Sequence, residues 1–569
     1  MIFTLTRKRI YQILIRTPIL TRRLSTIETK NNDNDDDDDY TLSTIMTDSV
    51  QVKEGKANIR LPEGAVFYNP AQVYNRDLSV ACLRLVSKRH HENECKRIQK
   101  NDPQTSCIPF EQLSPGVRQE NGLKIAEALS ATGLRSIRYA KEIPGIDTIY
   151  ANDIDAGAVE SIKHNVQSND VQNLVQASHD DAMNLLYSHR KPENQFHVVD
   201  LDPYGTPGQF LDGAVQCIKK NGVLCITATD MASLCGNNPH SCYSKYGSIP
   251  LHQPFCHEFA LRMILYSLHM QAARYDRIIE PLLCMSIDFY VRLFVRINYG
   301  SAKAQSQLGD IATVYNCTHC TSFFFQPYGQ ASLDERNNAK FRYAQGPPVG
   351  TSCTHCGSNL RVGGPIWLGP LFDHSFVSEL IGSIEQAPHD SYAYRDRMLS
   401  MLYVVKEELP NPLYFDNTKL ARIMHTQVPQ NKVLRSAILN AGYRVSSTHA
   451  RQDAIKTDAP HEVIWDIMRA LAEQSPTKRS AVERLNTDSP YYRLLTKPST
   501  IQVDFTEHPD WESEARKNKL IRFMGNPHAR WGPLGKAVTK KKRPSDESDP
   551  TTEKKQMKSD EDLSSDENL

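Results

Sequence analysis

The sequence predicts an α/β fold built around a mostly parallel sheet, and two observations lead to this prediction. Short apolar runs alternate with helical periods between Leu123 and Asp230 of the 569-residue chain. Polar residues cluster where the apolar runs end. Strands separated by helices of about 10–15 residues imply βαβ units, and ligands of such sheets bind beyond the carboxyl ends of the strands.

Each expected strand and helix is predicted from its own pattern of apolar residues. The expected strands, in chain order, are LKIAEAL, DTIYAND, LVQASHDDA, FHVVDLDPYG and GVLCITATD. The helices between them are TGLRSIRYAKEI, AGAVESIKHNVQSN, AMNLLYSHR and GQFLDGAVQCIKK. Alternation of apolar and polar residues over Cys284–Gly300 predicts one long strand near a sheet edge. By analogy, a doubly wound sheet completed by late antiparallel strands is the Rossmann-like fold of class I methyltransferases.

The first strand-to-helix turn, Ala128–Arg138, contains a single glycine, Gly133. A dinucleotide fingerprint needs three glycines to admit a diphosphate against the helix N-terminus. The single glycine therefore favours a cofactor without a diphosphate, and S-adenosylmethionine is such a cofactor. A nicotinamide oxidoreductase on a similar sheet is the alternative.

Carboxylates follow the second and third expected strands. Asp153 is placed to bind both hydroxyls of a ribose, and Asp181 can accept a hydrogen bond from an adenine amino group. Each aspartate alone could instead cap a helix or form an Asx turn, and Asp155 is a candidate cap. Polar residues at four strand ends together favour a binding site.

The fourth strand runs into Asp202-Pro203-Tyr204-Gly205, which resembles the Asp-Pro-Pro-Tyr type motif of amino-group methyltransferases. An exocyclic amine is a poor nucleophile because its lone pair is delocalised into the base. The Asp202 carboxylate and the Pro203 carbonyl can hold its two N–H groups and aim the lone pair at a methyl donor. Tyr204 offers a ring for stacking the extracted base, and Asp202 is also a candidate base. A DPYG found alone would more often be a type I turn.

Two CTHC motifs, separated by thirty-two residues, predict a zinc site. The expected ligands are Cys317, Cys320, Cys353 and Cys356. Four thiolates complete a tetrahedral site and leave no position for a substrate, so this zinc would be structural. His319 and His355 lie inside the motifs and are not expected to be ligands. Disulfides or redox-active CxxC pairs are the alternatives.

The remaining nine of thirteen cysteines, among them Cys82, Cys217 and Cys284, are scattered along the chain. Without a secretory signal, we expect them to be free, buried thiols in a reducing compartment. No apolar run reaches the roughly 20 residues of a membrane-spanning helix, so no membrane partner is expected.

The two ends of the chain have distinct compositions. Six basic residues precede the first acid, Glu28, as in a mitochondrial transit peptide; a basic disordered tail is the alternative. An acidic run, Asn31–Tyr40, follows, and initiation at Met46 would remove the presequence. Near the other end, Lys540–Arg543 matches a nuclear localisation signal, although short basic runs are also common in disordered tails. The sequence therefore predicts localisation to mitochondrion and nucleus.

Several long motifs between Gly55 and Lys536 resemble those of the tRNA (guanine-26-N2)-dimethyltransferases. They are FYNPAQVYNRDLS, EALSATGLRSIR, ANDID, DLDPYGTP, KYGSIP with HEFALR, MSIDFYVRLFVR, AGYRVSSTHARQDAIKTDAP and RWGPLGKA. The resemblance implies that S-adenosylmethionine gives two methyl groups in succession to the exocyclic amine of a guanine in tRNA. It indicates no obligate protein partner.

The same resemblance assigns roles to individual residues. Cofactor contacts would come from Arg76, Arg135, Asp153, Asp181 and Ala182, and the catalytic group would be Asp202, Pro203, Tyr204 and Phe67. The guanidinium of Arg76 can pair with the cofactor carboxylate. Phe67 would lie beside the methyl donor and the base, but it could also be ordinary core. The long polar segment Ser87–Pro115 departs from these motifs and is expected to be a surface loop.

The C-terminal half of the family contacts the tRNA. In this chain residues 419–456 predict a helix, a turn, a helix and a short strand, as in a winged helix. A phosphate-binding basic face would be formed by Lys432, Arg435, Arg444, Arg451 and Lys456. A solvated helix surface is the alternative.

The expected organisation has four parts. Residues 1–45 are a transit peptide and acidic linker, and 46–305 are the N-terminal region and methyltransferase domain. Residues 306–536 form an α+β, zinc-bearing, winged-helix-like tRNA-binding domain, and 537–569 a disordered charged tail. Two other functions share some of these features: an N6-adenine DNA methyltransferase would also carry DPYG, and a non-catalytic RNA-binding protein could keep the zinc site.

Overall fold

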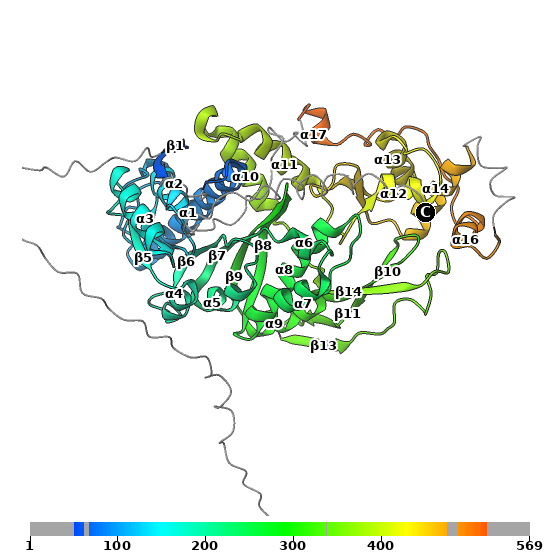
Figure 1. The fold of residues 1–569 in the computed structure, drawn as a ribbon, viewed down its shortest axis with the longest axis horizontal. Helices are drawn as coiled ribbons and strands as arrows, with labels where there is room; N and C mark the ends of the chain where they lie inside the picture. Colours follow the sequence, from blue (N-terminus) through cyan, green and yellow to red (C-terminus); the bar gives the residue numbers. More distant parts are fainter. Residues whose placement is uncertain (1–49, 62–67, 337, 475–485, 521–569) are drawn as a thin grey trace, which may run out of the picture. The chain divides into compact units, whose positions relative to one another are not determined.

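A computed structural model describes residues 50–61, 68–336, 338–474 and 486–520, which belong to the unit Asp48–Leu569 (Figure 1). The expected presequence, Phe67, the RWGPLGKA motif and the charged tail lie outside the described residues. In the part that is described, every helix is too short or too polar to cross a bilayer.

Seven strands form the central sheet, in the order β5-β4-β3-β6-β7-β9-β8. They are β3 Leu123–Glu127, β4 Ile146–Asp153, β5 Val175–His179, β6 Phe196–Leu201, β7 Ile218–Ala228, β8 Arg277–Ile287 and β9 Tyr290–Tyr299. Strands β3 to β7 are parallel, while β9 is antiparallel to both β7 and β8. Val198, Val199 and Leu201 of β6 are fully buried because helices cover both faces of the sheet. The predicted α/β sheet with late antiparallel strands is confirmed.

Helices connect the parallel strands as the sequence predicts. The crossover helices are α2 Leu134–Glu142, α3 Ala156–Ser168, α4 Ala182–Ser188 and α5 Leu211–Cys217. Helices α1 (Val73–Asn101) and α2 lie on one side of the sheet, and α4 and α5 lie on the other (Figure 1). After β7 come α6 Met231–Leu234, α7 Pro239–Tyr246 and α8 Cys256–Ala273. An N-terminal hairpin, β1 Val50–Glu54 and β2 Ala57–Leu61, packs through β2 on α2 and α3.

The prediction of one long strand over Cys284–Gly300 is wrong. The segment contains the end of β8 and all of β9, which pair as an antiparallel hairpin. The chain reverses at Asp288, whose φ of 47° lies in the left-handed region that aspartate tolerates better than most residues. Of these two strands, β8 lies at an edge of the sheet and β9 lies inside it.

The prediction of a surface loop over Ser87–Pro115 is also wrong in its first half. Helix α1 continues to Asn101, and only the residues after it are irregular, apart from the 3-10 turn Phe110–Gln112. No glycine or proline occurs between Ser87 and Pro103, and the lysine, arginine, glutamate and glutamine residues of this stretch favour a helix. The helix was missed because its exposed turns carry no apolar periodicity.

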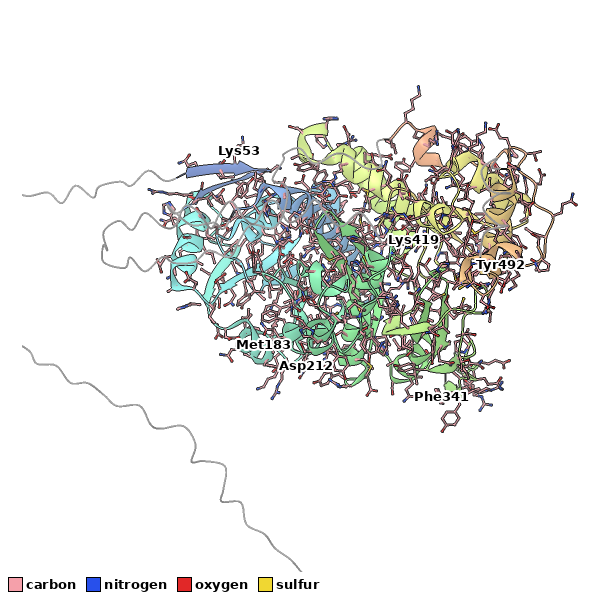
Figure 2. All side chains as sticks on the ribbon, turned by 45° about the vertical axis from the view of Figure 1, so that its right-hand side comes forward. Lys53, Met183, Asp212, Phe341, Lys419 and Tyr492 are labelled. Carbon is pink, nitrogen blue, oxygen red and sulfur yellow. A yellow bond between two sulfur atoms is a disulfide. The ribbon has the colours of Figure 1, made fainter. Side chains whose placement is uncertain are left out.

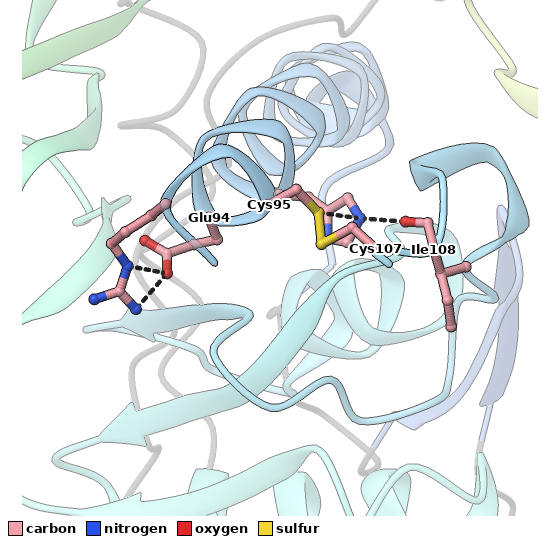
Figure 3. The surroundings of a disulfide bond; sticks show 6 residues. Glu94, Cys95, Cys107 and Ile108 are labelled. Carbon is pink, nitrogen blue, oxygen red and sulfur yellow. Dashed lines mark hydrogen bonds and ion pairs between the residues drawn. A yellow bond between two sulfur atoms is a disulfide. The ribbon is translucent and has the colours of Figure 1, made fainter. Parts of the chain in front are cut away.

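A disulfide joins Cys95 of α1 to Cys107, so the expectation that all nine remaining cysteines are free thiols is wrong (Figure 3). The two Cα atoms lie 5.7 Å apart, because the chain turns back along α1 after the helix ends. The carbonyl of Ile108 lies 2.7 Å from His91 Nε2 in the same region. The other seven cysteines are free, five of them buried and two, Cys235 and Cys256, half-buried.

The chain after β9 forms smaller sheets and helices. The segments that follow the central sheet are α9 Ser301–Ser306, β10 Ile311–Cys317, β11 Phe323–Pro327, β12 Gly329–Leu333, β13 Ala339–Tyr343, β14 Leu360–Trp367, α10 His374–Gln386 and α11 Arg395–Glu407. Strands β11, β10 and β14 form one sheet, and β12 and β13 form a hairpin that carries the half-exposed Phe341 (Figure 2).

The predicted order of helix, turn, helix and strand at residues 419–456 is confirmed. The winged module consists of β15 Phe415–Asp416, α12 Asn417–Ile423, α13 Asn431–Asn440, β16 Val445–Ser447 and β17 Ala454–Thr457. Its three strands pair in the order β15-β17-β16. Helix α14 His461–Glu473 follows, and α16 Pro490–Thr496 and α17 Glu514–Lys517 are the last described helices.

The basic face expected on this module is only partly exposed. Lys456 and Arg435 are buried, with 1% and 8% of their surface accessible. On the surface, Lys432 pairs with Glu507, Arg444 with Asp458, and Arg451 with Asp416. The prediction is therefore wrong for Lys456 and Arg435, because nothing in the local sequence identifies the distant groups that surround them.

A buried charge cluster, the Lys456 cluster, joins the winged module to helix α8 and strand β8. Lys456 Nζ lies 3.0 Å from Glu258 Oε2 and 2.9 Å from Glu408 Oε1. His449 Nδ1 donates to Glu408 at 2.8 Å, and its Nε2 accepts from the Ser286 amide at 3.1 Å. Burial raises the pKa of Glu408, but Lys456 and His449 outweigh it, so the pKa stays well below its usual range. The wing is thus attached to the central sheet by paired charges.

Candidate active site

The buried side-chain amide of Asn152, near the end of β4, connects β4 to the segments that follow β3 and β5. Its Nδ2 donates to the carbonyl of Ala128 at 3.1 Å and to that of Asp180 at 2.9 Å. Asn152 is 1% exposed. Asn152 is not among the residues predicted from the sequence, although its position beside Asp153 at the end of an apolar strand was a signal for it.

Asp153 ends β4 and organises the turn after β3. Its Oδ2 accepts from the Ala131 amide at 2.8 Å, and its Oδ1 accepts from the Asp155 amide at 3.0 Å. A carboxylate has about four acceptor positions, so capacity for a ribose diol remains. Asp155 caps α3 by accepting from Ala158 at 2.8 Å, which confirms the capping alternative for that residue.

Gly133 opens α2 with a φ of 75°, a conformation that favours glycine. A Cβ placed there would lie 3.3 Å from the side chain of Ile162 on α3. The single glycine of this turn is therefore required by backbone conformation and by packing against α3.

Asp181 and Ala182 lie at the start of α4, next to Met183, which Figure 2 marks. Asp181 is exposed and accepts from the Met183 amide at 2.7 Å as the N-cap, and Ala182 is buried. The cap uses one acceptor position of the carboxylate. The side chain can still accept a hydrogen bond from an amino group in solvent.

Arg135 contacts Asp202. Its guanidinium, in a side chain that is 5% exposed, donates to Asp202 Oδ2 and, at 3.2 Å each, to Asn75 Oδ1 and Ser79 Oγ. Asp202 Oδ1 accepts no hydrogen bond from any described residue, and the side chain of Asp202 is 21% exposed. The carboxylate is thus fixed by one oxygen and presents the other.

Asp200, two residues earlier, anchors the strand. It is fully buried and accepts from both terminal nitrogens of Arg292, at 2.9 and 2.8 Å, and from the Tyr139 hydroxyl at 2.6 Å. Burial raises the pKa of Asp200, but Arg292 and Arg135 outweigh it and hold the pKa below its usual range. The two aspartates of DLDPYG therefore have different positions: Asp200 is buried, and Asp202 faces outward.

The turn after Asp202 is tied to the loop after β7. Gly205 donates to Thr229 Oγ1 at 2.9 Å, and the Thr229 amide donates to the Gly205 carbonyl at 2.9 Å. Gly205 has a φ of 98°, which residues with a Cβ adopt only under strain. Pro203 is buried, and Tyr204 is 64% exposed. Backbone hydrogen bonds thus fix the Pro203 carbonyl region, while the Tyr204 ring remains accessible.

A second row of contacts supports this turn. Thr206 Oγ1 donates to the Tyr246 hydroxyl at 2.8 Å, and that hydroxyl donates to Asp230 Oδ1 at 2.7 Å. Lys245 Nζ lies 2.9 Å from Asp230 Oδ2. Lys245 and Tyr246, which belong to the KYGSIP motif at the end of α7, therefore support the DPYG turn through Asp230 and Thr206.

Arg76 is held by a carboxylate of the chain itself. Its Nε and one terminal nitrogen donate to the two oxygens of Glu54, at 2.6 Å each, and Arg76 is 8% exposed. The proposed pairing with a cofactor carboxylate stays a prediction.

Behind the site, burial raises the pKa of Glu127 to about 7, although Arg135 and Ser136 oppose the increase.

The four cysteines of the two CTHC motifs converge. Cys317 Sγ lies 3.4 Å from Cys356 Sγ, and Cys320 Sγ lies 3.5 Å from Cys353 Sγ. All four are buried and none forms a disulfide, so the disulfide alternative is wrong. A buried, closed set of four sulfur donors fits a structural zinc ion. His355 is not part of this set and stacks on Phe324 at 5.7 Å.

The family comparison decides the class. The model of the family described as "N2,N2-dimethylguanosine tRNA methyltransferase" matches residues 48–469. The chain belongs to this family. A curated member from Drosophila melanogaster, a tRNA (guanine(26)-N(2))-dimethyltransferase, is 42% identical, and the alignment covers 86% of each chain. A Saccharomyces cerevisiae member, whose name adds "mitochondrial", is 37% identical over 86% of this chain and 92% of its own length.

A solved structure supports the same assignment. The complex of Trm1 from Pyrococcus horikoshii with S-adenosyl-L-methionine is 30% identical and has a TM-score of 0.58. It covers 74% of this chain and 99% of the archaeal chain. The dimethylguanosine methyltransferase family thus accounts for the α/β sheet of this chain.

Proposed function

We propose that this enzyme transfers two methyl groups from S-adenosylmethionine to N2 of guanine 26 in tRNA, giving N2,N2-dimethylguanosine, and that the DPYG turn carries the reaction. Family membership supports the reaction. The observation that carries the catalytic role is the position of Asp202: it follows β6, one oxygen is bound by Arg135, and the other has no partner among the described residues.

The DPYG residues would act on the acceptor amine. Asp202 Oδ1 and the Pro203 carbonyl each accept one N–H of the guanine N2 amine, which aims the nitrogen lone pair along the transfer direction. Tyr204, which is exposed, stacks against the flipped base. When bound, S-adenosylmethionine supplies an electrophilic methyl group on a sulfonium. As the N–C bond forms, the amine becomes more acidic and loses a proton, which Asp202 can accept directly or through water.

Asp153, Asp181, Ala182, Arg76 and Arg135 would hold the cofactor. Asp153 and Asp181 each retain acceptor capacity beyond their backbone contacts, which supports ribose and amino-group binding. Arg76 would exchange part of its contact with Glu54 for the cofactor carboxylate. Phe67, outside the described residues, remains a proposed neighbour of the methyl donor.

Replacing Asp202 tests the catalytic role. We expect Asp202→Ala and Asp202→Asn to abolish dimethylguanosine formation, because the amide of the asparagine puts a donor where the amine needs an acceptor. Binding of tRNA should stay within about twofold of wild type, since the change is confined to one side chain. Mass analysis of tRNA nucleosides and a filter-binding assay measure the two quantities. Full activity in either variant would refute the role, and methylation of adenine in duplex DNA would refute the substrate class.

We propose that tRNA binding falls to the residues after about 306 and that the enzyme acts in mitochondrion and nucleus. The basic presequence, the Lys540–Arg543 run and the mitochondrial yeast relative support these localisations. A fluorescent fusion that lacks residues 1–45 should lose its mitochondrial fraction and keep its nuclear one. Unchanged mitochondrial import of this fusion would contradict the transit peptide.

A further inference from the structure

The amino edge of the central sheet contains a cavity that lies far from the DPYG turn. Its volume is about 760 Å³. Residues from the starts of β3, β6 and β7, from α1 and from α10 line it, and α1 and α10 lie side by side (Figure 1). His197, near the start of β6, and Asp202, just after its end, are five residues apart, which is roughly 16 Å along a strand. The cavity is therefore separate from the methyl-transfer site.

The arginines and the aspartate that line this cavity already have partners. Arg89 pairs with Glu379 at 2.8 Å, Arg97 with Glu94 at 2.7 Å, Arg296 with Glu280 at 2.7 Å, and Asp147 with Arg118 at 2.9 Å. Glu280 also pairs with Lys303 at 2.9 Å, so these paired groups carry no net negative charge. The lining lysines Lys124, Lys219 and Lys220 have no carboxylate partner among the described residues, so they add three positive charges.

Two of these lysines are partly buried and lie close to a histidine pair. The rings of His90 and His197 lie 4.5 Å apart, and His197 Nδ1 accepts from the Lys124 amide at 2.9 Å. Burial, and after it the positive charges of His90, Lys219 and Lys124, lower the pKa of His197 to about 2. Burial and then Lys124 also lower the pKa of Lys219, although the lining carboxylates Glu94 and Asp147 oppose the change. Positive groups therefore repel one another across this cavity, and a bound anion would relieve that repulsion.

The backbone of β7 brings its two lysines to this place. The pairing of β6 with β7 shifts register between Phe196 and Val198, so Lys219 to Gly222 form an irregular stretch at the start of β7. Asn221 has a φ of 63° within it. The irregularity lies outside the regular ladder that positions the DPYG turn.

We propose that this cavity binds a small anion with two or more phosphate groups, held by Lys124 and Lys219. The volume suits a small molecule, since ligand cavities are typically about 300–1,000 Å³. Lysine ammonium groups are common phosphate ligands. The base of a nucleotide would lie against the His90 and His197 rings, whereas pyrophosphate would contact the lysines alone. This inference is independent of the proposed methyl-transfer mechanism.

Calorimetric titration of the full, zinc-loaded chain tests the proposal, with S-adenosylmethionine at saturation so that the cofactor site is filled. Pyrophosphate and ATP are the two probes. We expect saturable binding of pyrophosphate, and tighter binding of ATP if the histidine rings contribute. The double variant Lys124→Gln with Lys219→Gln should weaken binding by about tenfold or more, because it removes both partly buried charges.

The matched control is Lys163→Gln, which removes an exposed lysine of α3 that pairs with Glu160 outside the cavity. It should bind both probes as wild type does. Wild-type methylation rates in the double variant would show that it is folded; if it does not fold, Lys220→Glu, at an exposed position, should weaken binding in its place. Absence of saturable binding, or equal binding by wild type and the cavity variants, would overturn the proposal. So would loss of tRNA affinity in the variants with no binding of either small probe, which would mark the cavity as an RNA contact.

Discussion

At the residue scale, the site depends on two aspartates, each of which is held by a different arginine. Asp200 is buried and fixed by Arg292, whereas Asp202 is fixed by one oxygen to Arg135 and presents the other. The sequence identified Asp202 because DPYG at the end of an apolar strand resembles the Asp-Pro-Pro-Tyr type motif. It could not identify its partner, because Arg135 lies 67 residues away and reaches Asp202 only once α2 has packed on the sheet.

Arg135→Lys tests this arrangement. Lysine keeps the charge but loses the planar group that contacts Asp202, Asn75 and Ser79 together. Because misplacing a reacting group by about 1 Å can cost about 10²-fold in rate, we expect kcat to fall by ten- to a hundredfold. The KM for tRNA should change little. Steady-state kinetics with matched tRNA would measure both; a change in KM alone would show that Arg135 acts in substrate binding instead.

At the scale of elements, the crossover helices and parallel strands were predictable because each has its own hydrophobic period. The hairpin of β8 and β9 was not, because alternation continues across its short turn at Asp288. The second half of α1 was missed because its residues are polar, and the Cys95–Cys107 disulfide because pairing depends on where that helix ends. The local sequence pattern thus identified the elements that bury an apolar face. It failed where a turn ends an element or where the surface of an element is exposed and polar.

The zinc site belongs to this scale as well. It connects strands β10 and β11 with a second, smaller hydrophobic core in the C-terminal part of the chain. The four cysteines pack with Leu420, Leu434 and Trp465, and the Trp465 indole donates to Ser322 Oγ at 3.0 Å. We expect Cys353→Ser to lose bound zinc and to lower the unfolding temperature of the whole chain, because thiolate–zinc bonds hold this core together. Elemental analysis and thermal unfolding check both effects. Cys235→Ser, at a half-buried cysteine outside the set, is the control; a stable, zinc-free but inactive Cys353→Ser protein would contradict a structural role.

At the scale of the whole molecule, the main hydrophobic core contains residues from Ala57 to Ala454 and therefore includes parts of both halves of the sequence. The Lys456 cluster lies where these halves meet. Removing one partner of a buried ion pair typically costs about 3–5 kcal/mol, because the remaining charges are left uncompensated. We expect Lys456→Met to destabilise the protein by about that amount in denaturant titrations.

The exposed pair of Arg444 with Asp458 provides the comparison, since Arg444→Met should cost no more than about 1 kcal/mol. Equal losses in the two variants would show that the buried cluster contributes nothing special. This contrast could not be predicted from the sequence, because Lys456 and Arg444 both occur there simply as basic residues near the second predicted helix.

The Lys456 cluster also has a consequence for how a nucleotide is chosen. A lysine shared by two glutamates from different parts of the chain resists hinge opening, since separating them would expose unpaired charges. The distance between the winged module and the DPYG turn is then constant. With tRNA bound by the residues after about 306, as we propose, the RNA must adapt to the protein, and the modified base is the one whose distance from the bound part of the tRNA equals that distance.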